Sequence, residues 1–160
     1  MEHLLQMRQF FNSGKTKPYT FRKTQLTKLR DAVIKFEEQI HQALYTDLKK
    51  NPEECWVTET GFLIAELNNA IKHLKAWMQP ETVQTNLLNA PSKSFILQEP
   101  MGVVLIISPW NYPFQLLLTP LAGAMAAGNC IVLKSSEFAP ATSTIMKKMI
   151  EENFEKDYIR

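Results

Sequence analysis

Hydrophobic residues recur at intervals of three and four along much of the first half of the chain. Over residues 21–48 they form a single stripe between lysine, arginine and glutamate residues, which is typical of an amphipathic helix. The pair Asn51-Pro52 ends or interrupts this helix, because proline biases the residue before it away from the helical conformation. The stripe consists of Leu26, Leu29, Val33, Phe36, Ile40 and Leu44.

A second apolar stripe predicts a helix from about residue 53 to residue 78, closed by Pro80. His41 and His73 fall on the polar faces of the two helices. Neither has a second ligand one helical turn away, so we interpret both as solvated histidines and expect no metal site. The second stripe consists of Leu63, Leu67, Ile71, Leu74 and Met78.

Residues 81–100 show a different pattern, in which β-branched and aromatic residues flank a turn at residues 89–92. This pattern predicts a β-hairpin. Its apolar residues do not fall on one side. We therefore expect either an arm that another chain covers or an edge of the main sheet.

The last third of the chain alternates between short apolar runs and helical patterns. We expect strands over residues 103–107 and 131–133, and helices over 114–127 and from about 140 to 154. Strands that alternate with helices of this length are typical of βαβ units, whose second strand returns parallel to the first. The fold class is therefore α/β: a helical part over 1–80, a hairpin arm over 81–100, and the first βαβα portion of a parallel sheet over 101–160.

Composition and charge exclude several classes of partner. Eighteen basic and sixteen acidic residues leave a formal net charge of +2, which gives no electrostatic reason to expect a nucleic acid. Residues 101–133 carry no charge, but prolines, glycines and asparagines interrupt them, so we predict buried strands and a helix rather than a membrane span. Two cysteines without a Cys-x-x-Cys pair, and no apolar leader, favour a reducing, cytoplasmic setting.

Two loops follow the predicted strands, at residues 108–112 and 134–137. Ligands of open α/β sheets bind beyond the carboxyl ends of the strands, and a parallel return brings both loops to the same edge. Lys134 has three hydrogen-bond donors and Glu137 has two acceptor oxygens, so together they could hold the vicinal hydroxyls of a ribose. The Asn111 carboxamide can donate a hydrogen bond to an oxyanion.

Two other interpretations fit the same residues. Lys134 and Glu137 could form a surface ion pair, worth about 0–1 kcal/mol. Asn111 could cap the helix that begins near Pro113.

The segments around these residues resemble the aldehyde dehydrogenase superfamily. The resemblance covers residues 99–104, 109–114, 120–129 and 134–137, and the Trp-Asn-Tyr-Pro-Phe sequence is most similar to the class 3 or fatty-aldehyde branch. It implies part of a Rossmann-like NAD(P)-binding domain, without the catalytic domain. The position after the lysine is often proline in this family and is Ser135 here.

The resemblance also implies a reaction, the oxidation of an aldehyde to a carboxylic acid. In this family a cysteine thiolate attacks the aldehyde, and the asparagine matching Asn111 helps a backbone N–H to hold the oxyanion. Hydride then passes to the nicotinamide, and a glutamate-activated water releases the acid. The residues matching Lys134 and Glu137 bind the adenine-side ribose. The loop that lines the cofactor cleft matches Ile107, Ser108, Pro109 and Trp110.

The nucleophilic cysteine and the general-base glutamate of the family fall beyond residue 160, so we expect this chain alone to be inactive. Cys55 and Cys130 sit in apolar surroundings, which predicts buried structural thiols with ordinary pKa values. Glu137 would repel a 2′-phosphate, which favours NAD, although NADP stays open. The family suggests a homodimer. The alternative is a stand-alone module that binds a nucleotide without catalysis or mediates assembly.

Overall fold

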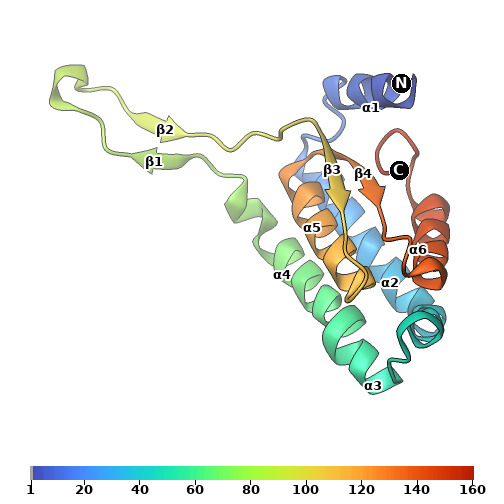
Figure 1. The fold of residues 1–160 in the computed structure, drawn as a ribbon. Coiled ribbons are helices and arrows are strands. Elements are labelled where there is room, and N and C mark those ends of the chain that lie inside the picture. Colours follow the sequence, from blue (N-terminus) through green and yellow to red (C-terminus); the bar gives the residue numbers. More distant parts are fainter. Residues whose placement is uncertain (1) are drawn as a thin grey trace.

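The computed structural model describes residues 2–160, and its N-terminal half is helical (Figure 1). The two apolar stripes face each other in the core, because every residue of the first stripe and Leu63, Leu67 and Leu74 of the second are buried. The helices are α1 (Glu2–Asn12), α2 (Tyr19–Leu48), α3 (Pro52–Cys55), the π-helical turn η1 (Trp56–Thr60) and α4 (Gly61–Trp77).

Two features of this half differ from the sequence-based prediction. Helix α1 lies in the predicted helical part but was not given bounds of its own, and the second predicted helix is interrupted by η1 instead of running continuously. The Asn51 side chain accepts a hydrogen bond from the Glu54 amide at 2.8 Å, so the Asn51-Pro52 pair begins a new helix as well as ending α2.

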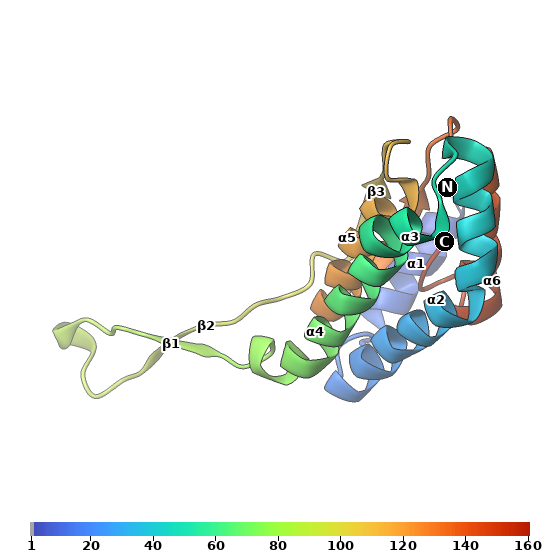
Figure 2. The same cartoon turned by 90° about the horizontal axis from the view of Figure 1, so that it is seen from below.

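The predicted hairpin forms a separate two-stranded sheet that projects from the body as an arm (Figure 2). Strands β1 (Glu81–Val83) and β2 (Ser94–Ile96) pair antiparallel, and the 3-10 turn η2 (Leu87–Asn89) lies at the tip. The arm is therefore not an edge of the main sheet. Leu87 and Leu88 are 93% and 95% exposed, so the arm has no apolar cover among residues 2–160.

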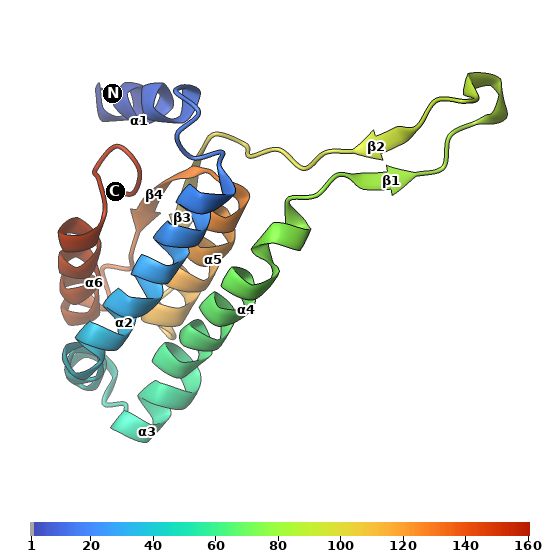
Figure 3. The same ribbon diagram turned by 180° about the vertical axis from the view of Figure 1, so that it is seen from behind.

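The main sheet has the predicted parallel topology. Strands β3 (Val103–Ile107) and β4 (Cys130–Lys134) pair in register, and α5 (Pro113–Ala127) connects them. Helix α5 lies between this sheet and the layer formed by α2 and α4 (Figure 3). Helix α6 (Pro140–Asn153) packs against α2. Ile159 bridges Ile131 in parallel, which adds the start of a third strand that the sequence analysis did not predict.

The end of α5 shows why Gly128 follows it. Gly128 has a φ of 88°, a left-handed conformation that favours glycine, and a Cβ there would lie 2.7 Å from the Arg22 guanidinium. Arg22 is buried and donates hydrogen bonds to the carbonyls of Thr16 and Ala126. The close approach of Arg22 therefore ties α2 to the end of α5. None of the helices in residues 2–160 is both long and apolar enough to cross a bilayer.

Candidate cofactor and oxyanion site

The two candidate loops leave the same edge of the main sheet. Ile107, the last residue of β3, is the register partner of Lys134, the last residue of β4. The Ser108 amide also donates a hydrogen bond to the Lys134 carbonyl at 3.1 Å, which extends the pairing by one step. The parallel return expected from the sequence is thus present, and the loops to α5 and α6 begin side by side (Figure 1).

Lys134 and Glu137 contact each other at this edge. The Lys134 Nζ lies 2.9 Å from Glu137 Oε2, and it also donates a hydrogen bond to the Ser135 carbonyl at 2.7 Å. The hydrogen bond from Lys134 lowers the pKa of Glu137, so the carboxylate is ionised at neutral pH. Both side chains are exposed, and this geometry suits a surface ion pair as well as a clasp for a diol.

Asn111 lies in the exposed turn between β3 and α5. Tyr112, not Asn111, occupies the N-cap position of α5, and the Tyr112 side chain makes no capping hydrogen bond to the helix. No residue in 2–160 forms a hydrogen bond with the Asn111 carboxamide, whereas its backbone carbonyl accepts one. The interpretation of Asn111 as a helix cap is therefore wrong, and its carboxamide can reach a ligand.

The N-terminus of α5 is capped instead by Glu59, which comes from η1. Glu59 Oε2 accepts a hydrogen bond from the Gln115 amide at 2.8 Å, and Glu59 Oε1 lies 2.6 Å from the Lys50 Nζ. Lys50 Nζ also donates to the Asn111 carbonyl at 3.1 Å and lies 3.9 Å from the centre of the Tyr112 ring. Burial raises the pKa of Glu59, although Lys50 and the α5 amides oppose that shift. This cluster was not predicted from the sequence.

A signal for Glu59 was nonetheless present. Glu59 precedes Leu63 by four residues and follows Cys55 by four, so it occupies the apolar line of the second stripe. A carboxylate on such a line has to find a partner inside the protein. The missing information was the identity of that partner, because Lys50 lies outside the helix.

The π-turn η1 buries both Glu59 and Thr60, whereas Trp56 and Val57 are exposed. Gly61 permits this turn, since its N–H donates to the Trp56 carbonyl and a Cβ would lie 2.6 Å from that oxygen. Such turns are frequent at functional sites.

Thr60 gives His41 a partner that the sequence analysis did not expect. The Thr60 hydroxyl lies 3.0 Å from His41 Nε2 and donates a hydrogen bond to Glu37. His41 is partly buried and therefore not simply solvated. His73 bonds to the Asn69 carbonyl and stacks on Trp77. No group of three metal-binding side chains occurs among residues 2–160.

Comparison with known proteins decides which family this geometry belongs to. A family model described as the aldehyde dehydrogenase family matches residues 5–159. The chain belongs to the aldehyde dehydrogenase family. The resemblance inferred from the loop sequences is confirmed.

Relatives of the chain include family 3 aldehyde dehydrogenases. The chain is 47% identical over 150 residues to 4,4'-diaponeurosporen-aldehyde dehydrogenase of Staphylococcus aureus, covering 94% of this chain and 33% of that protein. It is 44% identical to chloroplastic aldehyde dehydrogenase family 3 member I1 of Arabidopsis thaliana, covering 97% and 28%. The chain thus spans about a third of the length of the curated relatives it matches.

Solved structures show the same fold. A substrate-bound state of Staphylococcus aureus AldH superimposes with a TM-score of 0.97 at 45% identity, covering 99% of this chain and 35% of that chain. A betaine aldehyde dehydrogenase from Staphylococcus aureus in complex with NAD+ superimposes with a TM-score of 0.81 at 26% identity, covering 98% and 31%. The partial aldehyde dehydrogenase fold predicted from the sequence is therefore present.

The other candidate cofactor-binding residues, at the end of β3 and in the loop that follows it, differ in exposure. Ile107, Pro109 and Trp110 are exposed, whereas Ser108 is 5% exposed. The Ser108 hydroxyl is buried without a hydrogen-bond partner among residues 2–160. A buried hydroxyl without a hydrogen-bond partner is unfavourable.

Neither cysteine of this aldehyde dehydrogenase chain resembles a nucleophile. Cys55 and Cys130 are both buried, and burial raises the pKa of each thiol to about 11. The ordinary pKa expected from the sequence is thus wrong, but the expected inertness is strengthened, because the thiolate is the reactive form.

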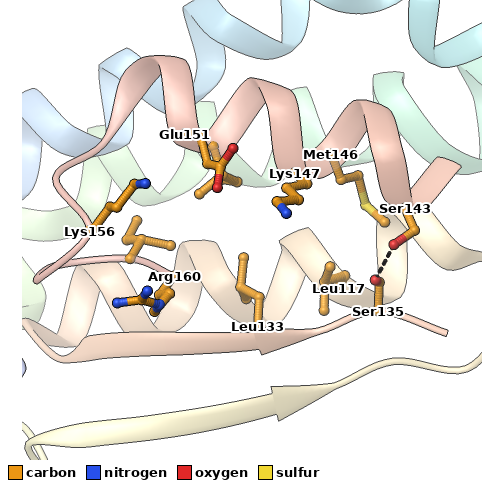
Figure 4. Close-up of a pocket in the computed structure, with 11 residues that line it drawn as sticks. Leu117, Leu133, Ser135, Ser143, Met146, Lys147, Glu151, Lys156 and Arg160 are labelled. Atoms are coloured by element: carbon orange, nitrogen blue, oxygen red, sulfur yellow. Dashed lines mark hydrogen bonds between the residues drawn. The ribbon is translucent and has the colours of Figure 1, made fainter. Parts of the chain in front are cut away.

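A cavity of about 340 Å³ lies close to this edge, between β4 and α6 (Figure 4). Ser135 and Ser143 hydrogen-bond to each other on its wall, and Lys147, Glu151 and Arg160 bring charges of both signs. Lys134, Glu137 and Asn111 do not line it. The cavity is therefore distinct from the candidate aldehyde dehydrogenase site.

Proposed function

We propose that the chain is the N-terminal, cofactor-binding part of an NAD(P)-dependent aldehyde dehydrogenase that oxidises aldehydes to carboxylic acids. The observation that carries this proposal is the parallel register of β3 and β4, from whose shared edge the loops bearing Asn111, Lys134 and Glu137 extend. The NAD+ complex of the related betaine aldehyde dehydrogenase supports it. A stand-alone nucleotide-binding or assembly module is the alternative, and it would leave the complete protein without turnover.

The side chains at the edge fit a nicotinamide dinucleotide. Lys134 would donate to the hydroxyls of the adenine-side ribose and Glu137 would accept from them, while the unpartnered Ser108 hydroxyl lies in the loop with Ile107, Pro109 and Trp110. When bound, the cofactor would supply the oxidising equivalent of the reaction. The ionised Glu137 disfavours a 2′-phosphate, so we propose NAD over NADP.

Asn111 would act on the substrate. Its carboxamide is exposed and unbonded within residues 2–160, so it can donate a hydrogen bond to the oxyanion that forms when a thiolate adds to the aldehyde. The attacking thiolate would come from outside this chain, because Cys55 and Cys130 are buried and protonated at neutral pH. Residues 1–160 alone are therefore expected to be inactive.

The experiment that tests this proposal is a measurement of aldehyde-dependent NAD reduction by the complete protein. We expect Asn111→Ala to lower kcat about 100- to 1000-fold while the Kd for NAD stays the same, because the lost hydrogen bond acts on the oxyanion only. Asn69→Ala, which removes an exposed carboxamide from the outer face of α4, is the matched control and should keep full activity. An unchanged kcat in Asn111→Ala would remove the oxyanion role.

We also propose that the complete protein is a cytoplasmic homodimer. The exposed apolar tip of the arm supports assembly with a second copy, because an uncovered patch of this kind is unfavourable in water. Two unpaired buried cysteines suit a reducing compartment such as the cytoplasm.

A further inference from the structure

The buried ion pair of Lys50 and Glu59 lies directly beneath the turn that carries Asn111. The side chain of Lys50 is 8% exposed and that of Glu59 is 0% exposed, and their charged atoms are 2.6 Å apart. They come from different elements, since Lys50 lies between α2 and α3 and Glu59 lies in η1. Neither residue has a role in the proposed reaction.

The pair holds the turn at two points. Lys50 Nζ donates to the Asn111 carbonyl at 3.1 Å, and Glu59 Oε2 accepts from the Gln115 amide at 2.8 Å. These two contacts lie four residues apart, one before Pro113 and one after it. Every polar atom of the pair is used, because Glu59 Oε1 takes the remaining contact with Lys50.

The Tyr112 ring fixes the middle of the same turn. Lys50 Nζ lies 3.9 Å from the ring centre, a distance typical of a cation–π contact. Tyr112 itself has a non-helical backbone, with φ of −131° and ψ of 67°, and its side chain does not cap α5. The conformation of the turn is therefore maintained from outside by Lys50 and Glu59.

Stability alone is a weak reason to bury such a pair. Charges lose their hydration on burial, and replacing a buried ion pair with well-packed hydrophobic side chains of similar volume is often neutral or stabilising. A role in orienting Asn111 explains the pair better. A carboxamide that stabilises the charge of a forming oxyanion is effective only when its position is fixed before the reaction.

We infer that Lys50 and Glu59 are positioning residues, which hold the backbone on both sides of Pro113 so that the Asn111 carboxamide points at the reacting oxygen. This inference rests on the proposed function, since it assigns the pair to the same oxyanion site. It makes neither residue catalytic, because both act through Asn111.

The test compares variants of the complete protein. Lys50→Met removes the charge and the Lys50 contacts to the Asn111 carbonyl and the Tyr112 ring, while keeping a side chain of similar length. Lys50→Met/Glu59→Gln in addition leaves no unpaired charge in the protein interior. We expect kcat to fall about 10- to 100-fold in both, with the Kd for NAD unchanged and the double variant folded. Arg30→Met/Asp31→Asn, which removes a partly exposed ion pair of α2 together with the hydrogen bond from Arg30 to Asn68 of α4, is the matched control and should leave kcat unchanged.

A double-mutant cycle separates positioning from a general structural role. If Lys50 acts through Asn111, then Lys50→Met should have little further effect on kcat in an Asn111→Ala background. Multiplying effects would overturn the inference, as would a normal kcat in Lys50→Met. Failure of the proposed function would look different, since Asn111→Ala alone would then leave kcat unchanged.

Discussion

Under the proposed function, Glu137 is the residue whose charge would bear most directly on the choice between NAD and NADP. Its pKa is lowered by the hydrogen bond from Lys134, so it is anionic at neutral pH and would repel the 2′-phosphate of NADP. If the complete protein prefers NAD as proposed, we expect Glu137→Gln to reduce that preference about fivefold. The ratio of kcat/KM for the two cofactors measures this preference.

Glu152→Gln, which neutralises another exposed carboxylate on α6, serves as the control and should leave the ratio unchanged. If Glu137→Gln also left the ratio unchanged, Lys134 and Glu137 would be an ordinary surface ion pair.

Helices α5 and α6 both lack a capping side chain at their own N-cap residues. Each begins with a proline. A carboxylate from the N-terminal helices supplies the cap in each case: Glu59 for α5 and Asp47 for α6. The helical half of the chain thus sets where both crossover helices begin, and with them the two loops of the candidate site.

Asp47 gives a test of this arrangement. It accepts hydrogen bonds from the amides of Ala141 and Thr142 and from the Thr142 hydroxyl, at 3.1, 2.8 and 2.8 Å. We expect Asp47→Ala to destabilise the start of α6 by about 1–2 kcal/mol, and Asp47→Asn to do so less. Faster amide hydrogen exchange in peptides from α6 of the complete protein would report it. Asp31→Ala on the same helix should not change that exchange.

At the scale of the whole molecule, the arm formed by β1, η2 and β2 is a separate sheet whose tip packs against no other element among residues 2–160. A two-stranded hairpin is marginal by itself, and strands β1 and β2 have only three residues each. If the complete protein is the homodimer proposed above and the exposed tip takes part in assembly, Leu87→Lys/Leu88→Lys should shift it from dimer to monomer in sedimentation experiments. Leu5→Lys, at an exposed leucine of α1, is the control. A dimer that persisted in the arm variant would show that the arm is not needed for assembly.

Elements with strong local patterns could be predicted to within a few residues. Strand β3 has the predicted bounds, and β4 extends the prediction by one residue at each end, because each is a continuous apolar run. The predicted burial of β3 is wrong among residues 2–160, since Leu105 and Ile107 are 60% and 67% exposed and nothing in this part of the chain covers that face. Helix α5 was delimited by Pro113 and Gly128, whose backbone preferences mark helix ends. Helix α1 was not delimited within the predicted helical part, since it was not recognised as a separate stripe, and turn η1 was missed because a π-turn leaves a helical pattern nearly intact.

The amino-acid sequence by itself determined the long helices α2, α5 and α6, the parallel sheet and the edge from which Asn111, Lys134 and Glu137 extend. Periodicity and the handedness of βαβ connections are enough for that. Only the tertiary structure decided that Lys50 and Glu59 hold the Asn111 turn. Lys50 is 61 residues from Asn111 and Glu59 is 56 from Gln115, and no local pattern encodes a partner at that separation. Such contacts form because a buried charge must be satisfied by whatever the folded chain brings beside it.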